Sequence, residues 1–204
     1  MLGVLALCLS IQAAPSLDLV RGGPGDGSFR YWAVEDTFLE AGRPDGNFGR
    51  DPLLSAGPGK TILIRFGDLE RLIPPGKRVR DARLVLRQEI GGEPVLRSMR
   101  TILGPWGEGG GRRGTVLGRV NAVPETAAER ASTWRHRFGG TVPAAWQSAG
   151  AGGASDGKTI EGLKTRVDGR DFVIEGLGAV VESARANPVA NDGWSLTFEN
   201  VVDF

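Results

Sequence analysis

Apolar and polar residues alternate at every second position over several short stretches of this 204-residue chain. The pattern is clearest at residues 62–66, 82–87 and 194–198. A period of two is typical of antiparallel strands that bury one face and expose the other. Glycine and proline, with 32 and 12 residues, supply turn signals between these stretches. We therefore predict an all-β fold, an antiparallel β-sandwich that is jelly-roll-like and has long loops.

Helix signals are confined to two short segments. Residues 124–130 begin with proline, which suits the first position of a helix. Residues 177–186 follow the strand-like run 172–175 and have room for a short helix. The sequence therefore predicts one or two short helical turns, within a single domain that spans residues 31–204.

The first 14 residues, MLGVLALCLSIQAA, are apolar and end in small residues. Such a stretch resembles a secretory signal peptide and is too short to cross a bilayer. The alternative is a buried N-terminal strand or helix. We interpret residues 1–14 as a signal peptide and residues 15–30 as a linker, which predicts a secreted, extracellular protein with no membrane span. A secreted chain without disulfides favours bacterial export.

The rarest residue types exclude several kinds of site. The chain has one cysteine, Cys8, and one histidine, His136. A cysteine-ligated zinc site, a disulfide framework and a redox dithiol are therefore excluded. The 25 basic and 24 acidic residues leave a formal charge of +1, which gives no basic field for nucleic acid.

Three motif patterns occur in the glycine-rich part of the chain. Residues 152–159 match the phosphate-binding P-loop, residues 153–157 the nucleophile elbow and residues 109–114 the dinucleotide fingerprint. Each motif works only between a strand and a helix, and none of the three stretches is flanked that way. We interpret all three as loops, and we expect no nucleotide.

Acidic residues raise two alternatives. Glu35–Asp36 and the pair Asp168 and Asp171 could act as acid and base in glycoside hydrolysis, although solvated turn carboxylates are commoner. Glu35 and Asp36, or the turn at residues 45–51, could instead bind a structural calcium ion. We expect no other cofactor.

A series of motifs follows the order found in one known family. They are Asp36–Glu40 (DTFLE), 44–49 (PDGNFG), 61–66 (TILIRF), 73–76 (IPPG), 79–86 (VRDARLVL), 105–108 (PWGE), 132–135 (STWR), 172–181 and 193–198. This order resembles the DNRLRE domain, which is grouped with carbohydrate-binding module family 96, across residues 31–204. Residues 109–131 depart from the family as an insertion-like loop, and residues 201–204 lack its usual closing strand.

The resemblance implies a secreted β-sandwich, and some relatives bind acidic polysaccharides such as alginate. Flat aromatic rings suit the C–H faces of sugars, and arginine forks suit uronate carboxylates. Binding groups tend to gather on loops. The candidate carbohydrate-binding residues are the loop residues Trp106, Trp134, Arg135, Arg137 and Trp146.

Core packing is the competing interpretation for every tryptophan, and we expect Trp32 and Trp194, which lie in strand patterns, to be buried. Arg83 and Arg87 are expected on the wet face of one strand, and Arg65 is expected to point outward from another. The predicted function is non-catalytic binding of a polysaccharide or cell-surface glycan, and the polysaccharide is predicted to be acidic. The alternative is a structural or adhesive module of a cell-surface protein, and a more remote alternative is a polysaccharide-degrading enzyme.

Overall fold

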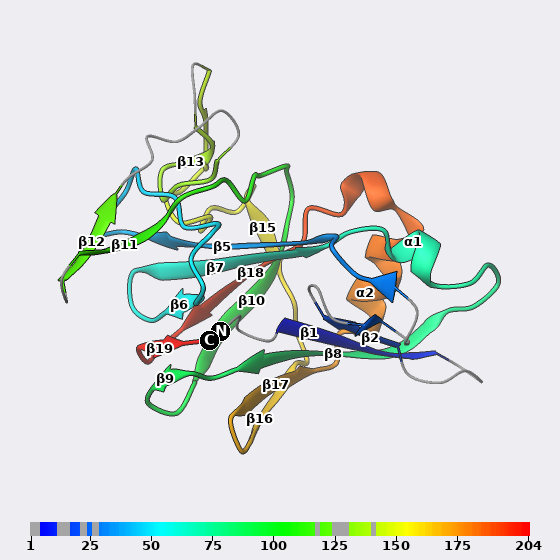
Figure 1. The fold of residues 1–204 in the computed structure, drawn as a ribbon. Coiled ribbons are helices and arrows are strands. Elements are labelled where there is room, and N and C mark those ends of the chain that lie inside the picture. Colours follow the sequence, from blue (N-terminus) through cyan, green and yellow to red (C-terminus); the bar gives the residue numbers. More distant parts are fainter. Residues whose placement is uncertain are drawn as a thin grey trace.

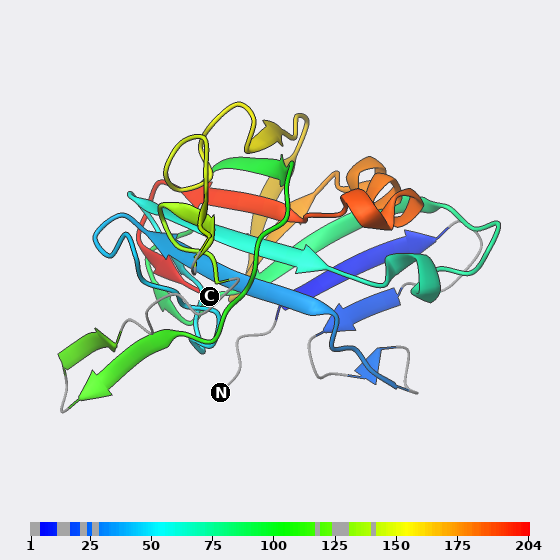
Figure 2. The same ribbon diagram turned by 90° about the horizontal axis from the view of Figure 1, so that it is seen from above.

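The fold is an antiparallel β-sandwich, as the sequence predicts (Figure 1). The structure, a computed structural model, describes residues 5–11, 17–20, 24–25, 29–116, 119–123, 131–139 and 142–204. Two five-stranded sheets form the two layers, and long loops lie over the outer side of one of them (Figures 1 and 2).

The first sheet has the strand order β16-β17-β8-β1-β2. Its strands are β16 Lys164–Asp168, β17 Asp171–Glu175, β8 Val79–Arg87, β1 Leu5–Ile11 and β2 Leu17–Val20. The second sheet has the order β15-β10-β18-β7-β5. Its strands are β15 Gly157–Thr159, β10 Leu96–Ile102, β18 Trp194–Phe198, β7 Lys60–Phe66 and β5 Val34–Glu40.

Short strands and helices complete the described part of the chain. The strands are β3 Pro24–Gly25, β4 Phe29–Arg30, β6 Ser55–Ala56, β9 Ile90–Gly91, β11 Arg112–Val116, β12 Arg119–Val123, β13 His136–Phe138, β14 Ala144–Ala145 and β19 Val202–Asp203. The helices are α1 Leu69–Leu72, α2 Gly178–Ala186 and a 3-10 turn at Pro188–Ala190. None of these helices is long and apolar enough to cross a membrane.

Two sequence predictions bear on these shorter elements. The helix predicted at residues 177–186 is confirmed as α2. Within the insertion-like loop, β11 and β12 pair as an antiparallel hairpin that extends away from the sandwich (Figure 2). The helical turn predicted at residues 124–130 lies outside the described residues.

The core between the sheets is built from the predicted alternation. Ile62, Ile64 and Phe66 of β7 are buried there together with Leu84 and Leu86 of β8. The intervening Arg83 and Arg87 are exposed, as expected. Each strand therefore contributes one apolar row to a shared interior, which removes that row from water and stabilises the sandwich.

The two strand-like tryptophans behave differently. Trp194 is 2% exposed and lies in the core, as predicted, whereas Trp32 is 63% exposed, so its predicted burial is wrong. The neighbouring Tyr31 is buried in its place, and its hydroxyl donates a hydrogen bond to the Gly67 carbonyl at 2.6 Å. This bond satisfies the polar end of the ring, so the core accepts Tyr31 and leaves Trp32 at the surface.

The N-terminal segment is part of the first sheet in this structure. β1 pairs with β8 along its whole length and with β2 on its other side. Residues 5–11 thus form a strand, as in the alternative to a signal peptide, and three short strands, β2, β3 and β4, lie within the predicted linker. Cleavage of residues 1–14 as a signal peptide stays a prediction.

Candidate functional site

The outer face of the second sheet carries a second apolar cluster. Leu39, Leu63 and Ile102 point to this face, opposite the main core. Two loop tryptophans, Trp106 and Trp146, pack on them. The loops at residues 103–111, 131–139 and 142–156 therefore form a cover over the middle of the sheet, which we call the loop cover (Figure 1).

Asn47, in the turn at residues 44–49, holds two separate segments of this cover together. Its Nδ2 donates hydrogen bonds to the Glu108 carbonyl at 2.8 Å and to the Ser132 carbonyl at 2.9 Å, and its Oδ1 accepts one from the Gly111 amide at 2.8 Å. The approach is so close that a Cβ at Gly111 would lie 2.2 Å from the Asn47 carbonyl oxygen. The motif at residues 44–49 (PDGNFG) therefore positions the loops of the cover.

Asp156 organises a second part of the cover. Its carboxylate, 4% exposed, accepts hydrogen bonds from the amides of Gln147, Ser148 and Gly153 at 2.7, 3.0 and 2.8 Å. The segment that matches the P-loop is thus closed on a protein carboxylate, and it continues into strand β15. A P-loop would instead open toward a phosphate and lead into a helix.

The other two motif matches also lack their required context. Residues 109–114 lead into strand β11, where a dinucleotide-binding loop would lead into a helix. Residues 153–157, which match the nucleophile elbow, end at the start of β15. Both stretches belong to loops that run directly into strands.

Two of the three tryptophans predicted to face a ligand are buried. Trp106 and Trp146 are 2% and 5% exposed. Each indole N–H reaches a carbonyl oxygen, at Asp192 (2.6 Å) for Trp106 and at Thr133 (3.0 Å) for Trp146. Because these bonds satisfy their polar atoms, both rings can complete the apolar cluster. The prediction that they serve as exposed sugar platforms is therefore wrong.

The remaining three predicted residues point to different places. Trp134 is half-buried. Its ring packs closely on Gly150, where an added Cβ would lie 2.5 Å from the ring atoms. Arg135 is exposed and pairs with Asp45 at 3.1 Å. Arg137 is half-buried and packs against Gly104. The five candidates do not gather in one site, and of these three only Trp134 lines a cavity described below.

Trp134 lies at a cavity of about 780 Å³ on the outer face of the second sheet, which we call the basic groove. Its cations are Lys60, Arg97 and Arg100, and no described lining residue is acidic. The hydroxyl groups come from Thr61, Ser98, Thr159, Ser195 and Thr197. Sequence reasoning missed the three cations because it placed binding groups on loops and gave the strands a structural role.

The cations of the basic groove are held to different degrees. Arg100 donates to the carbonyls of Ala151, Gly153 and Gly157 at 2.9, 2.7 and 2.5 Å, so its guanidinium is fixed beneath the loop cover. Lys60 donates to the Ser55 hydroxyl at 2.6 Å and pairs with Glu40 at 3.7 Å, so its charge is neutralised. The side chain of Arg97 is exposed. The groove thus combines a fixed positive charge with one that a ligand can reach.

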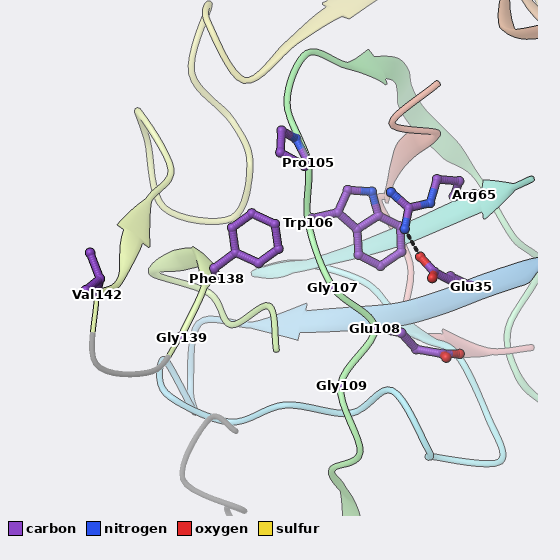
Figure 3. Close-up of a pocket in the computed structure, with 10 residues that line it drawn as sticks. All are labelled: Glu35, Arg65, Pro105, Trp106, Gly107, Glu108, Gly109, Phe138, Gly139 and Val142. Atoms are coloured by element: carbon purple, nitrogen blue, oxygen red, sulfur yellow. Dashed lines mark hydrogen bonds and ion pairs between the residues drawn. The ribbon is translucent and has the colours of Figure 1, made fainter. Parts of the chain in front are cut away.

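A second cavity of about 810 Å³ lies elsewhere on the same face, and we call it the aromatic pocket (Figure 3). It is lined by Glu35, Arg65, Pro105, Trp106, Gly107, Glu108, Gly109, Phe138, Gly139 and Val142. Arg65 points to the outer face as predicted, where it forms an ion pair with Glu35 and lies 5.3 Å from the centre of the Trp106 ring.

A half-buried carboxyl group, that of Asp192, lies near this pocket. Burial raises the pKa of Asp192, and the positive charges of Arg65 and Arg137 oppose the shift. The Asp192 carbonyl also accepts the Trp106 indole bond. Asp192 therefore links the pocket residues Trp106 and Arg65 to Arg137 of the loop cover.

The residues predicted to bind calcium do not form a cage for it. Glu35 is committed to Arg65, and the Asp36 amide donates to a Glu108 carboxylate oxygen at 3.2 Å. In the part of the chain that the structure describes, no three histidine, cysteine or acidic side chains gather as metal ligands. In the alternative turn, Asp45 faces Arg135.

Comparison with known proteins identifies no relative of this chain. No protein-family profile matches the chain, and no significant match appears among curated proteins or solved structures. The function must therefore be argued from the two cavities themselves.

Proposed function

We propose that this protein is a secreted, non-catalytic carbohydrate-binding module that holds an acidic polysaccharide in the basic groove. The observation that carries the proposal is the charge of the groove, which is set by Arg97 and Arg100, since Lys60 is paired with Glu40 and no described lining residue is acidic. The resemblance to the DNRLRE domain, some members of which bind alginate, agrees with it. Secretion is supported by the signal-like character of residues 1–14.

The chemistry of the groove suits a polymer of uronic acids. The exposed Arg97 presents a planar fork that can bind a carboxylate with two parallel hydrogen bonds. Arg100 is fixed, and it adds positive potential without needing to rearrange when a ligand binds. Trp134 supplies an aromatic edge, and the hydroxyls of Ser98 and Thr197, 2.9 Å apart, can exchange hydrogen bonds with sugar hydroxyls.

Binding should be measured by titration calorimetry and affinity gel electrophoresis against alginate, polygalacturonate and a neutral glucan. We expect retention by the two acidic polymers, weakening as salt is added because the contacts are largely ionic. Arg97→Ala and Trp134→Ala should each lower the affinity about tenfold. The matched control is Arg87→Ala, which removes an exposed arginine from β8 in the other sheet and should leave binding unchanged.

Two results would overturn the proposal. If the protein is retained neither by alginate nor by polygalacturonate, the structural or adhesive alternative is favoured. Release of new reducing ends or unsaturated uronates from these polymers would show catalysis, which the proposal excludes.

A further inference from the structure

The aromatic pocket is separate from the basic groove. The two cavities share no lining residue, although both open on the outer face of the second sheet. The apolar cluster of Leu39, Leu63 and Ile102 and the tryptophans above it occupy the middle of that face. A ligand in one cavity therefore has its own set of contacts.

The polar side of the aromatic pocket is a neutralised ion pair. Arg65 and Glu35 face each other across β7 and β5, and their side chains are 24% and 40% exposed. The Arg65 guanidinium is held in place by Glu35 and by the Trp106 ring, at 5.3 Å from its centre. The pair thus offers planar donors and acceptors in fixed positions, while its two charges cancel.

The rest of the described pocket lining is largely apolar. Phe138, which is half-buried, turns its ring toward Trp106 across the pocket (Figure 3). Three glycines, Gly107, Gly109 and Gly139, also line the cavity, so no side chains fill it at these points. A volume of about 810 Å³ falls within the range of small-molecule sites, about 300–1,000 Å³, and has room for a sugar ring.

The charges of the pocket select against the ligand proposed for the groove. Its described lining holds two carboxylates, Glu35 and Glu108, and one guanidinium, Arg65. An anionic sugar would lack a free cation at the Arg65–Glu35 pair, because the Arg65 charge is already paired with Glu35. An apolar ligand would shield from water those polar atoms of the pair that are not engaged in the Arg65–Glu35 bond.

We propose that the aromatic pocket binds a neutral pyranose residue. The C–H face of the sugar packs on the Phe138 ring, and neighbouring hydroxyls bond to the Arg65–Glu35 pair. Trp106 acts as a positioning residue, because its buried ring supports Arg65. The inference goes beyond the proposed function, since it assigns a second site with a different sugar class and does not depend on the groove.

The test is calorimetry of the full chain with neutral oligosaccharides of glucose, mannose, galactose and xylose. We expect at least one of these to bind, and Phe138→Ala and Glu35→Gln to lower its association constant about tenfold or more. Phe138→Leu keeps the apolar volume without the ring, so it gives the same test if the alanine variant does not fold. Arg87→Ala, which removes an exposed arginine from β8 in the other sheet, is the control and should leave neutral-sugar binding unchanged.

The outcomes separate this inference from the proposed function. No binding of any neutral oligosaccharide, or equal weakening by Arg87→Ala, would overturn the pocket assignment. Alginate retention by Phe138→Ala protein reports on the groove alone, so either assignment can fail while the other stands. Displacement of the neutral sugar by an acidic oligosaccharide in Trp134→Ala protein would also refute the selectivity inferred for the pocket.

Discussion

Replacing Asn47 with alanine removes three short hydrogen bonds from the loop cover at once. The side chain bonds to the carbonyls of Glu108 and Ser132 and to the Gly111 amide, at 2.8, 2.9 and 2.8 Å. Each lost bond should cost about 1–1.5 kcal/mol, because it leaves a backbone group without its partner. We therefore expect Asn47→Ala to lower the free energy of unfolding by about 3–4.5 kcal/mol, a large share of the roughly 5–15 kcal/mol typical of a domain.

The assay is urea unfolding at 25 °C, with the free energy obtained by linear extrapolation. Thermal unfolding should agree, with a fall in Tm of about 2–4 °C per kcal/mol for a domain of this size. Asn200→Ala is the matched control. Asn200 is exposed and donates to one carbonyl, that of Glu93 at 2.9 Å, so its loss should cost about 0.5 kcal/mol or less.

A loss below about 1 kcal/mol for Asn47→Ala would refute the idea that this side chain anchors the cover. Asn47→Asp gives a sharper version of the test. One oxygen of the new carboxylate would face the Glu108 and Ser132 carbonyls, which raises the pKa of that group in the folded state. The penalty should be absent below the unfolded pKa of about 3.9 and fully present above the higher folded pKa, so acidification should bring the variant closer to the wild type.

The hydrogen bond from Arg185 lowers the pKa of Glu182 from 4.5 to about 2. The resulting stability should be present above about pH 4.5 and be lost as the pH falls toward 2, and Glu182→Gln should flatten the urea midpoints over that interval. Gly150 has a φ of +77°, and a Cβ there would lie 2.5 Å from the Trp134 ring, so Gly150→Ala should displace the ring and weaken alginate binding in the same calorimetry. Export of the full chain should remove residues 1–14, and mass spectrometry that finds them in the secreted product would refute cleavage.

The strands of the sandwich core are predictable because their signal is local. In β7, β8 and β18 the side chains at every second position are apolar, and the structure buries those rows against each other. A period of two is independent of the rest of the fold, since it follows from the geometry of a single strand. Helix α2 is also predictable from a local signal, since its residues directly follow a strand. It buries Val181 in the core.

The tryptophans were harder to place, because burial of a loop residue depends on segments that are distant in the sequence. Trp106 is buried because its indole reaches Asp192, 86 residues away. One feature of the sequence predicts that loops cover this face of the sheet. Leu63 lies between Ile62 and Ile64, so the middle of β7 is apolar on both faces, which predicts that something packs on its outer side. The loops with Trp106 and Trp146 are what packs there.

The basic groove was missed because β10 carries a weak pattern. Its sequence, LRSMRTI, alternates poorly, and the pairing with β18 shifts register between Leu96 and Ser98. Arg97 lies at that irregularity, and Arg100 follows on the outer face, two positions after Ser98. Neither position could be assigned to a face from the sequence, since an irregularity of one residue exchanges the two faces of a strand.

Both cavities depend on the strand registers of the second sheet. The pairing of β5 with β7 sets Glu35 opposite Arg65 at the aromatic pocket, and the pairing of β18 with β7 sets Ser195 beside Leu63. A slip of one residue in β7 would turn Arg65 into the core and would expose Ile64, which is fully buried. The core therefore enforces the register, and the register fixes the polar groups on the outer face. It follows that the sugar class proposed for each cavity depends on the same hydrophobic pattern that makes the sandwich fold.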